Sequence, residues 1–297
     1  MTFGYGFFLA GGVAAGAAVS WITAPRLRVD RHAMMDVVFW GMVAGMIGAR
    51  LLFVLLDLDF FVSLCSNPDS VLPAGLGCTE GRSCYPGQEC VDGWCQNFGD
   101  CFAAAKFWHG GLVFFGGVLV GIPAVVLVAK LKRMPPSSVL ALVTVGVPLG
   151  HVFGRLGCFV KGCCYGHPSS HLLAVEGKLP VQLIEAAGEL VIFVIVFLWF
   201  WRLTRHRTAL PGRLVLSVPV LFLTLYSPLR FITELLRGDA LRGFFVEVSW
   251  PALAERFGFS PRAPVLLSTS QGIVLVLFLV AMMYWLLVWP RARKSSR

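Results

Sequence analysis

The chain has 297 residues, of which 57% are hydrophobic and only 14% are charged, and its formal net charge is +9. Soluble proteins are about 45–50% apolar and about 25% charged. A soluble core of this size cannot hide such an apolar surplus. The composition therefore predicts an all-α integral membrane protein, and it argues against a disordered protein, a nucleic-acid binder and a water-soluble two-domain enzyme.

Seven apolar stretches approach the length of about 20 residues that a spanning helix needs. In chain order they are 3–23, 34–56, 108–129, 137–153, 182–201, 214–229 and 269–289. The fourth and sixth stretches are short and contain Pro148 and Pro219, so their ends are poorly defined. We expect a single transmembrane domain over 1–297, built as a bundle of about seven helices.

The basic residues indicate how these helices cross the membrane. Fourteen of the 25 Lys and Arg residues fall in four short segments, 24–33, 130–136, 202–213 and 290–297, whereas 57–107 has two basic and seven acidic residues. Because cytoplasmic loops are enriched in Lys and Arg, the N-terminus is predicted outside and the C-terminus in the cytoplasm. No basic residue precedes Arg26, so the first stretch is expected to be a retained helix and not a signal peptide.

Six of the nine cysteines lie in the long connection predicted to face outward: Cys65, Cys78, Cys84, Cys90, Cys95 and Cys101. An even number of cysteines in a polar, turn-rich external loop is typical of a small disulfide-stapled unit. The spacing does not select a pairing, and a zinc site is the rival interpretation. We expect an external cysteine-rich insertion over 62–101, and an external loop or interfacial arm over 238–267.

The other three cysteines, Cys158, Cys163 and Cys164, lie in the segment GRLGCFVKGCCYG (154–166). Adjacent cysteines are poorly suited to a disulfide with each other. A bridge from Cys158 to either of them and a set of free, buried thiols both stay open. The glycines at 150, 154, 157, 162 and 166 predict a re-entrant or broken helix here. The sequence shows no metal-ligand spacing and implies no cofactor.

Glycines also recur four residues apart, as in Gly12/Gly16, Gly41/Gly45, Gly117/Gly121 and Gly146/Gly150. Small residues at this spacing allow close approach of helix backbones in lipid, so these runs predict tight packing and no activity.

Several ionisable residues are predicted at membrane depth, where they point to function by default. They are Arg50, Arg155, Glu185, Glu189, Arg230, Glu234 and Arg237, the last three at helical spacing on one face. The planar fork of arginine suits phosphate. We expect a polar cavity near the outer leaflet in which Arg155, Arg230 and Arg237 hold a phospholipid head group. The alternative is that each Arg snorkels to the interface or pairs with a Glu for assembly.

At these residues the sequence resembles the prolipoprotein diacylglyceryl transferase family of the bacterial inner membrane. The similar segments follow the family's order along nearly the whole chain: Tyr5-Gly6, Asp36, Gly48-Ala49-Arg50, WHGGLVFFGGVLVG (108–121), GRLGCFVKGCCYG (154–166), PVQLIE (180–185), LRFITELLR (229–237) and Gln271. Only the cysteine-rich insertion lies outside this pattern.

The resemblance implies transfer of the diacylglyceryl group from phosphatidylglycerol to the lipobox cysteine of prolipoproteins, with release of glycerol phosphate, at the bacterial plasma membrane. It implies catalytic roles for Arg155, Arg230, Glu185 and Tyr5. The substrate-binding residues that it implies are Arg155, Arg230, Arg237, Glu234, Gly157, Gly166 and Gln182. Arg155 and Arg230 are expected to hold the phosphate.

Two positions depart from the family pattern. Phe115 stands where many members have His, and Cys158 replaces a usual Asn. A phenyl ring cannot carry a proton, so the candidates for another base are His109, His151 and His167. Two alternatives stay open: a non-catalytic paralogue that binds phospholipid or lipoprotein, and thiol redox chemistry at the three clustered cysteines.

Overall fold

The computed structural model describes residues 2–66, 88–92, 94–97, 101–106, 111–169, 174–205, 210–238, 243–256, 262 and 264–294. Six helices in this part are long and apolar enough to cross a membrane: Gly6–Leu27, Arg31–Leu56, Pro136–Lys161, Val181–Thr204, Gly212–Leu236 and Thr269–Ala292. A shorter apolar helix, Phe115–Leu131, coincides with the remaining predicted span. The prediction of an all-α integral membrane protein is therefore confirmed.

The chain divides into two compact units, one of Met1–Met35 with Met134–Arg297 and one of Asp36–Arg133. The first unit holds α1 (Thr2–Thr23), a 3-10 turn (Ala24–Leu27), α5 (Pro136–Lys161), α6 (Val181–Thr204), α7 (Gly212–Val215), α8 (Ser217–Leu236), β3 (Phe244–Ser249), α9 (Pro251–Arg256), β4 (Pro264–Ser268), α10 (Thr269–Met283), a π-helical turn (Tyr284–Val288) and α11 (Trp289–Lys294). Helix α2 (Arg31–Leu56) begins in this unit and continues into the second.

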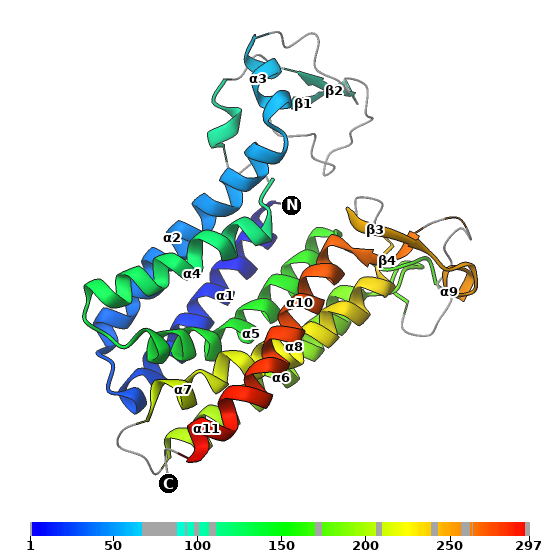
Figure 1. The fold of residues 1–297 in the computed structure, drawn as a ribbon. Coiled ribbons are helices and arrows are strands. Elements are labelled where there is room, and N and C mark those ends of the chain that lie inside the picture. The colour runs from blue at the N-terminus through cyan, green and yellow to red at the C-terminus, as the bar shows by residue number, and fades with distance from the viewer. Residues whose placement is uncertain are drawn as a thin grey trace. The chain divides into compact units, whose positions relative to one another are not determined.

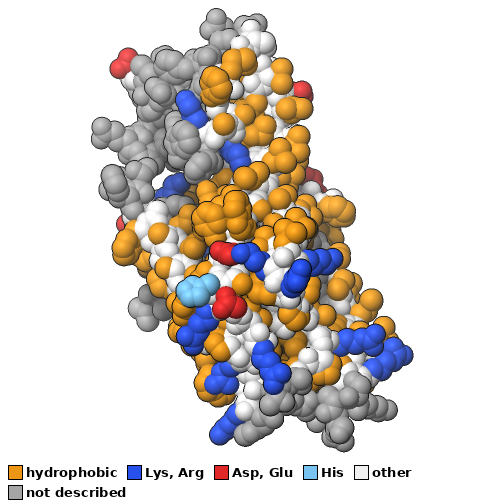
Figure 2. Space-filling view, turned by 90° about the vertical axis from the view of Figure 1, so that its left-hand side faces the viewer, with side chains coloured by type: hydrophobic (Ala, Val, Ile, Leu, Met, Phe, Trp, Pro, Cys, Tyr) orange, Lys and Arg blue, Asp and Glu red, His pale blue; other side chains and the backbone are white. Residues whose placement is uncertain are grey.

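Helix α5 is the centre of the first unit, where it packs against α1, α6 and α8, while α10 packs against α8 (Figure 1). Leucines such as Leu198 and Leu279 remain about half exposed, and hydrophobic side chains cover much of the face in Figure 2. In a membrane protein such side chains face lipid tails. The side chains buried inside the bundle include large apolar ones such as Leu142 and Phe200 as well as charged ones such as Glu185.

Glycines make the contact between α1 and α5. A Cβ atom added at Gly146 would lie 2.5 Å from the carbonyl oxygen of Gly16, and one added at Gly12 would lie 3.0 Å from that of Gly150. The first distance is shorter than real Cβ contacts in proteins, and the second would require the neighbouring helix to shift slightly. The expectation that four-residue glycine spacing serves helix packing is confirmed at this interface.

Gly146→Ala is expected to lower the unfolding temperature of the purified protein in detergent, because the new methyl group pushes α5 away from α1. Gly154→Ala is the matched control, since nothing lies within 4 Å of a Cβ at that position. Because alanine favours the helix over glycine, Gly154→Ala is expected to gain about 0.5–1 kcal/mol of stability. Thermal unfolding followed by circular dichroism measures both, and equal shifts for the two variants would contradict the close contact.

The glycine-rich segment is less broken than predicted. Helix α5 was expected to end near residue 153, but it continues to Lys161 and ends at Gly162, whose φ of +71° is left-handed. Gly146 and Gly150 do not interrupt the helix, because they are packing positions against α1. The irregular chain runs instead from Gly162 to the start of α6 at Val181.

Helix α8 also extends beyond the predicted end at residue 229, since it reaches Leu236 with Pro228 inside it. Helix α10 begins at Thr269, as predicted, because a capping box formed by Ser268 and Gln271 defines its N-terminus. The Gln271 amide donates to Ser268 Oγ at 3.2 Å, and the Ser268 amide donates to Gln271 Oε1 at 3.1 Å. Gln271 Nε2 then reaches the Phe231 carbonyl on α8 at 3.2 Å.

Between α8 and α10, strands β3 and β4 form an antiparallel pair in which Phe244 faces Ser268 and Val248 faces Leu266. Phe245 and Trp250 are exposed on this segment. Both are large apolar side chains, which is compatible with the interfacial arm predicted over 238–267.

The second unit holds the rest of α2, α3 (Leu58–Ser66), β1 (Gln88–Val91), β2 (Trp94–Asn97), a 3-10 turn (Ala103–Ala105) and α4 (Phe114–Leu131). Helices α2 and α4 also meet through glycine, because a Cβ at Gly48 would lie 2.4 Å from the Gly116 carbonyl oxygen. Helix α4 begins at Phe114, later than the predicted 108, after Gly111 with its φ of +71° and the extended Val113.

A disulfide between Cys65 and Cys101 confirms that the predicted insertion is stapled. Cys95 is also disulfide-bonded, whereas Cys78 and Cys84 lie outside the described residues.

Arg50 connects α2 to the chain that follows the insertion. It is 7% exposed and donates to the carbonyls of Ala103 (2.5 Å), Ala104 (2.7 Å) and Gly111 (3.1 Å). The guanidinium of Arg50 thus fastens the chain after the insertion to α2.

Candidate functional site: a buried arginine–glutamate network

Three helices of the first unit bring together the charged residues that the sequence singled out. Glu185, on the first turns of α6, is 2% exposed and binds two guanidinium groups. Its Oε1 atom lies 2.9 Å from Arg155 Nη2 on α5 and 3.0 Å from Arg230 Nη1 on α8. One carboxylate therefore holds three helices together by charge.

The network continues along α8. Arg230 Nη2 lies 2.7 Å from Glu234 Oε2, one helical turn away, and Arg237 Nη1 lies 3.6 Å from the same oxygen. The side chain of Arg230, between the two carboxylates, is 9% exposed, whereas those of Arg155 and Arg237 are 23% and 15% exposed. The two ends of the network are thus its accessible cations.

Arginines stand at both ends of this network. Its described ion pairs join three guanidinium groups through two carboxylates. A guanidinium group binds phosphate with two parallel hydrogen bonds. The partly exposed arginines at the two ends are therefore suited to a phosphate group.

A second pair links α5 and α6, one helical turn away from the contact between Arg155 and Glu185. His151 precedes Arg155 by four residues, and Glu189 follows Glu185 by four. His151 Nδ1 lies 2.9 Å from Glu189 Oε1, and Glu189 is 1% exposed. A carboxylate on Nδ1 fixes the orientation and tautomer of an imidazole, as it does in catalytic dyads.

The chain between α5 and α6 is fixed by tight backbone contacts around Gly166. The Gly166 amide donates to the Leu179 carbonyl at 2.9 Å, and the Gly238 amide, just beyond α8, donates to the Tyr165 carbonyl at 3.1 Å. A Cβ at Gly166 would lie 2.7 Å from the Leu179 carbonyl oxygen. Only glycine fits there, and Gly166 forms an isolated β-bridge with Arg237.

Gly166→Ala is therefore expected to displace Arg237 and to lower both phosphate binding and stability. Gly177→Ala, with open space around its Cβ but a φ of +72°, is the control for backbone strain in the same connection. Unfolding temperature with and without phosphatidylglycerol measures both effects. A Gly166→Ala variant with the same lipid-induced stabilisation as the wild type would refute the positioning of Arg237 by this contact.

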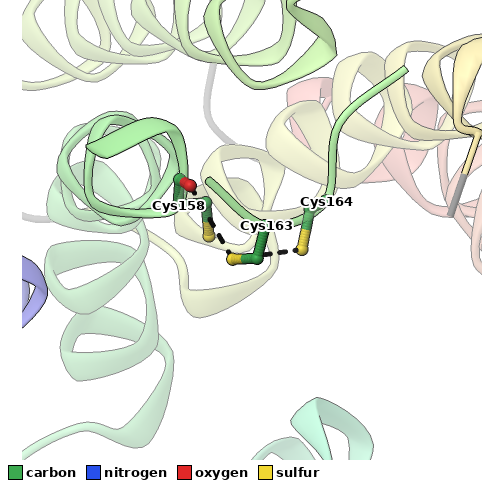
Figure 3. Close-up of side chains that lie close together, drawn as sticks. All are labelled: Cys158, Cys163 and Cys164. Carbon is green, nitrogen blue, oxygen red and sulfur yellow. Dashed lines mark hydrogen bonds between the residues drawn. The ribbon is translucent and has the colours of Figure 1, made fainter. Parts of the chain in front are cut away.

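The three cysteines of the 154–166 segment come together at the end of α5 (Figure 3). All three are free and partly buried, which agrees with the free-thiol alternative and not with a bridge from Cys158. Cys163 Sγ lies 3.7 Å from the Cys158 carbonyl oxygen and 3.8 Å from Cys164 Sγ. Hydrogen bonds with the other two thiols, followed by the charge of Arg237, lower the pKa of the Cys164 thiol.

Three other residues named from the sequence, Gln182, Gly157 and His167, are buried. Gln182, 3% exposed, donates from Nε2 to the Cys163 carbonyl at 2.6 Å and thus supports the cysteine turn. Gly157 is buried within α5, and His167 is 7% exposed. The Tyr5 side chain and His109 lie outside the described residues.

Sequence reasoning named His151 and Glu189 separately but missed that they form a pair. The signal was present in the matching four-residue spacings of His151/Arg155 and Glu185/Glu189. For the three cysteines, sequence reasoning left a bridge and free thiols open, and the structure brings the thiols together without a bridge.

The protein is thus a multi-pass membrane protein in which three helices enclose an arginine–glutamate network suited to an anionic head group. The family model of prolipoprotein diacylglyceryl transferases matches residues 3–289, and the chain belongs to this family. It is therefore a bacterial membrane transferase of lipoprotein biosynthesis.

Several proteins named phosphatidylglycerol–prolipoprotein diacylglyceryl transferase are similar to the chain. That of Clostridium tetani (strain Massachusetts / E88) is 23% identical over 245 residues, which cover 80% of this chain and 81% of the relative. Those of Staphylococcus xylosus and Staphylococcus aureus (strain MSSA476) are 23% and 25% identical over 253 and 243 residues, covering 80% of this chain and 74% of each relative.

Proposed function

We propose that this protein transfers the diacylglyceryl group of phosphatidylglycerol to the lipobox cysteine thiol of prolipoproteins and releases glycerol phosphate. The observation that carries the proposal is the buried network of three arginines and two glutamates, in a chain that belongs to this family. Phosphatidylglycerol has a phosphate monoanion, and the guanidinium of the partly exposed Arg155 is suited to bind it.

Arg155 is proposed to bind the phosphate, with Arg237 at the opposite end of the network. Arg155 is the most exposed of the three arginines and keeps only one carboxylate partner among the described residues. Arg230, enclosed by Glu185 and Glu234, is better suited to positioning than to direct contact. This revises the sequence-based expectation that Arg155 and Arg230 hold the phosphate together.

In the transfer, the acceptor thiolate attacks the glyceryl carbon that bears the phosphate ester. A C–S bond forms, the C–O bond breaks, and glycerol phosphate leaves with the bonding electron pair. The phosphate therefore gains a negative charge in the transition state. Arginines held in place beforehand by buried carboxylates stabilise that charge without reorganisation.

His151 is proposed to accept the proton of the thiol in place of the His that is absent at Phe115. Its pairing with Glu189 fixes the ring, and it lies one helical turn from Arg155, the proposed phosphate ligand. Of the other two candidates, His109 lies outside the described residues and His167 is buried.

We further propose that the end of the first unit with the 162–180 connection and the β3–β4 pair faces outward. The basic segments 24–33, 202–213 and 290–297 belong to the opposite helix ends, as positive-inside bias requires. The insertion 62–101 is then external, where its disulfides persist, and 238–267 lies at the outer surface as an interfacial arm.

Mass spectrometry of a lipobox peptide incubated with purified protein and phosphatidylglycerol in detergent tests the proposal. We expect a diacylglyceryl mass gain on the peptide cysteine, reduced about 10²–10³-fold in rate by Arg155→Ala. Arg202→Ala, on the far end of α6, is the control and should retain the wild-type rate.

The competing proposal is a non-catalytic relative that binds phospholipid, which is suggested by Phe115 and Cys158. It predicts that phosphatidylglycerol raises the unfolding temperature while the peptide gains no mass. In that case Phe115→His is the first change to make. Retention of the whole charged network supports the transferase.

A further inference from the structure

We propose that the sulfurs of Cys158, Cys163 and Cys164 form a binding site for a thiophilic metal ion of the zinc type, whose open fourth position takes a thiol. The site lies at the end of α5, outside the arginine–glutamate network. The metal site stands independently of the proposed function, whereas the identity of its thiol ligand as the lipobox cysteine rests on that function.

The separations of the sulfurs match such a site. All three Sγ atoms lie within 4.8 Å of one another, and those of Cys163 and Cys164 are 3.8 Å apart. A tetrahedral zinc ion with Zn–S bonds of about 2.3 Å separates its sulfur ligands by about 3.8 Å. Figure 3 shows the three sulfurs close together at the end of α5, with that of Cys163 between the other two. Small side-chain rotations would complete the geometry.

The local backbone is shaped to bring the thiols together. Gly162, with a φ of +71°, ends α5 and turns the chain, and the Cys163 amide returns to the Cys158 carbonyl at 3.1 Å. Cys164 then adopts a φ of +60°, a left-handed conformation that is unfavourable for a non-glycine residue. This turn places two adjacent thiols on the same side, where extended chain would place them on opposite sides.

The charge of the surroundings is also suitable. Three thiolates around a divalent ion carry one net negative charge, and Arg155 and Arg237 both exert electrostatic attraction on Cys164. The cations of the network are therefore placed to stabilise the complex. Soft thiolate ligands select zinc-type or Cu(I) ions over hard ions such as Mg²⁺.

Three protein ligands leave one tetrahedral position open, which in zinc proteins distinguishes sites that bind a substrate from structural sites. A thiol that enters this position loses its proton to solvent or to a base, and its sulfur becomes a metal-bound thiolate. The metal stays divalent, so no electron donor or acceptor is needed. The acceptor in the proposed function is a thiol, and Arg155 lies one helical turn from Cys158.

The first test is the metal content of the full-length protein purified in detergent without chelators. We expect a stoichiometric zinc ion, lost from Cys158→Ser and Cys163→Ser. Lys161→Ala, in the same turn but without a sulfur, should keep the metal. Because a variant can fail to fold, Co²⁺ titration of metal-depleted wild-type protein provides a second measurement. It should produce a sulfur-to-cobalt charge-transfer band in the near ultraviolet, which added Zn²⁺ removes.

The absence of this band, or a mass lower by two hydrogen atoms for a disulfide among the three cysteines, would overturn the metal site. Binding of Cu(I) with exclusion of Zn²⁺ would overturn the zinc-type assignment. A lipobox peptide should shift the cobalt d–d bands, whereas the peptide with Ser in place of Cys should not; equal spectra overturn the open thiol position. Diacylglyceryl transfer that persists in metal-free protein overturns the acceptor role and leaves the proposed function standing. Metal binding without transfer overturns the proposed function, and the acceptor role with it, but leaves the metal site standing.

Discussion

The Glu185→Gln variant is expected to lose diacylglyceryl transfer and a large part of its stability together. Glu185 is 2% exposed, and the same oxygen atom binds Arg155 and Arg230. The amide of Gln is nearly the same size but carries no charge, so both guanidinium groups lose their shared counter-ion. Removal of one partner from a buried ion pair costs about 3–5 kcal/mol.

Two further variants identify the cause of this loss. Glu176→Gln, an exposed carboxylate in the 162–180 connection, is the control and should behave as the wild type. The double variant Glu185→Gln/Arg155→Gln removes one of the orphaned cations and should recover part of the unfolding temperature without recovering transfer. If Glu185→Gln alone unfolds at the wild-type temperature and remains active, the shared carboxylate is not what organises the site.

The His151→Gln variant is expected to transfer the diacylglyceryl group about 10²–10⁴ times more slowly than the wild type, the usual contribution of a positioned base. Its binding of phosphatidylglycerol should persist, because Arg155 and Arg237 are unchanged. Glu189→Gln should have a smaller effect in the same direction, since Gln can still contact Nδ1 but stabilises a protonated ring less. Single-turnover transfer to the lipobox peptide, with lipid binding measured separately, distinguishes these effects.

His32→Gln provides the matched control, because His32 is exposed and packs edge-on against Trp21 at 5.0 Å, away from the network. Wild-type transfer by His151→Gln would exclude His151 as the base. The remaining histidine candidates would then be His109 and His167.

Hydropathy predicted the existence of the helices better than their ends. The first, second, fifth and seventh stretches are close to α1, α2, α6 and α10. The predicted stretch 137–153 is shorter than α5, because Gly150, His151 and Gly154 resemble a break in an apolar pattern. These residues are accommodated within the helix by tertiary contacts: Gly150 packs against α1, and His151 pairs with a carboxylate on α6. No local window of sequence contains such contacts.

The same limit applies to the site. The sequence predicts Arg155, Glu185, Arg230 and Glu234 as functional residues, because charges at membrane depth are rare. It does not reveal that Glu185 is shared by two arginines, since that follows from the packing of α5, α6 and α8. The roles of the individual residues stay predictions, and the Tyr5 side chain lies outside the described residues.

Helix α5 carries two sets of spaced residues on two of its faces. One face carries Gly146 and Gly150 against α1, and another carries His151, Arg155 and Cys158 at intervals of four and three residues. A single inserted or deleted residue between these sets would rotate one relative to the other by about 100°. Either the glycine contact or the polar row would then be lost. The spacing between the two sets along α5 is thus fixed by two neighbouring helices at once.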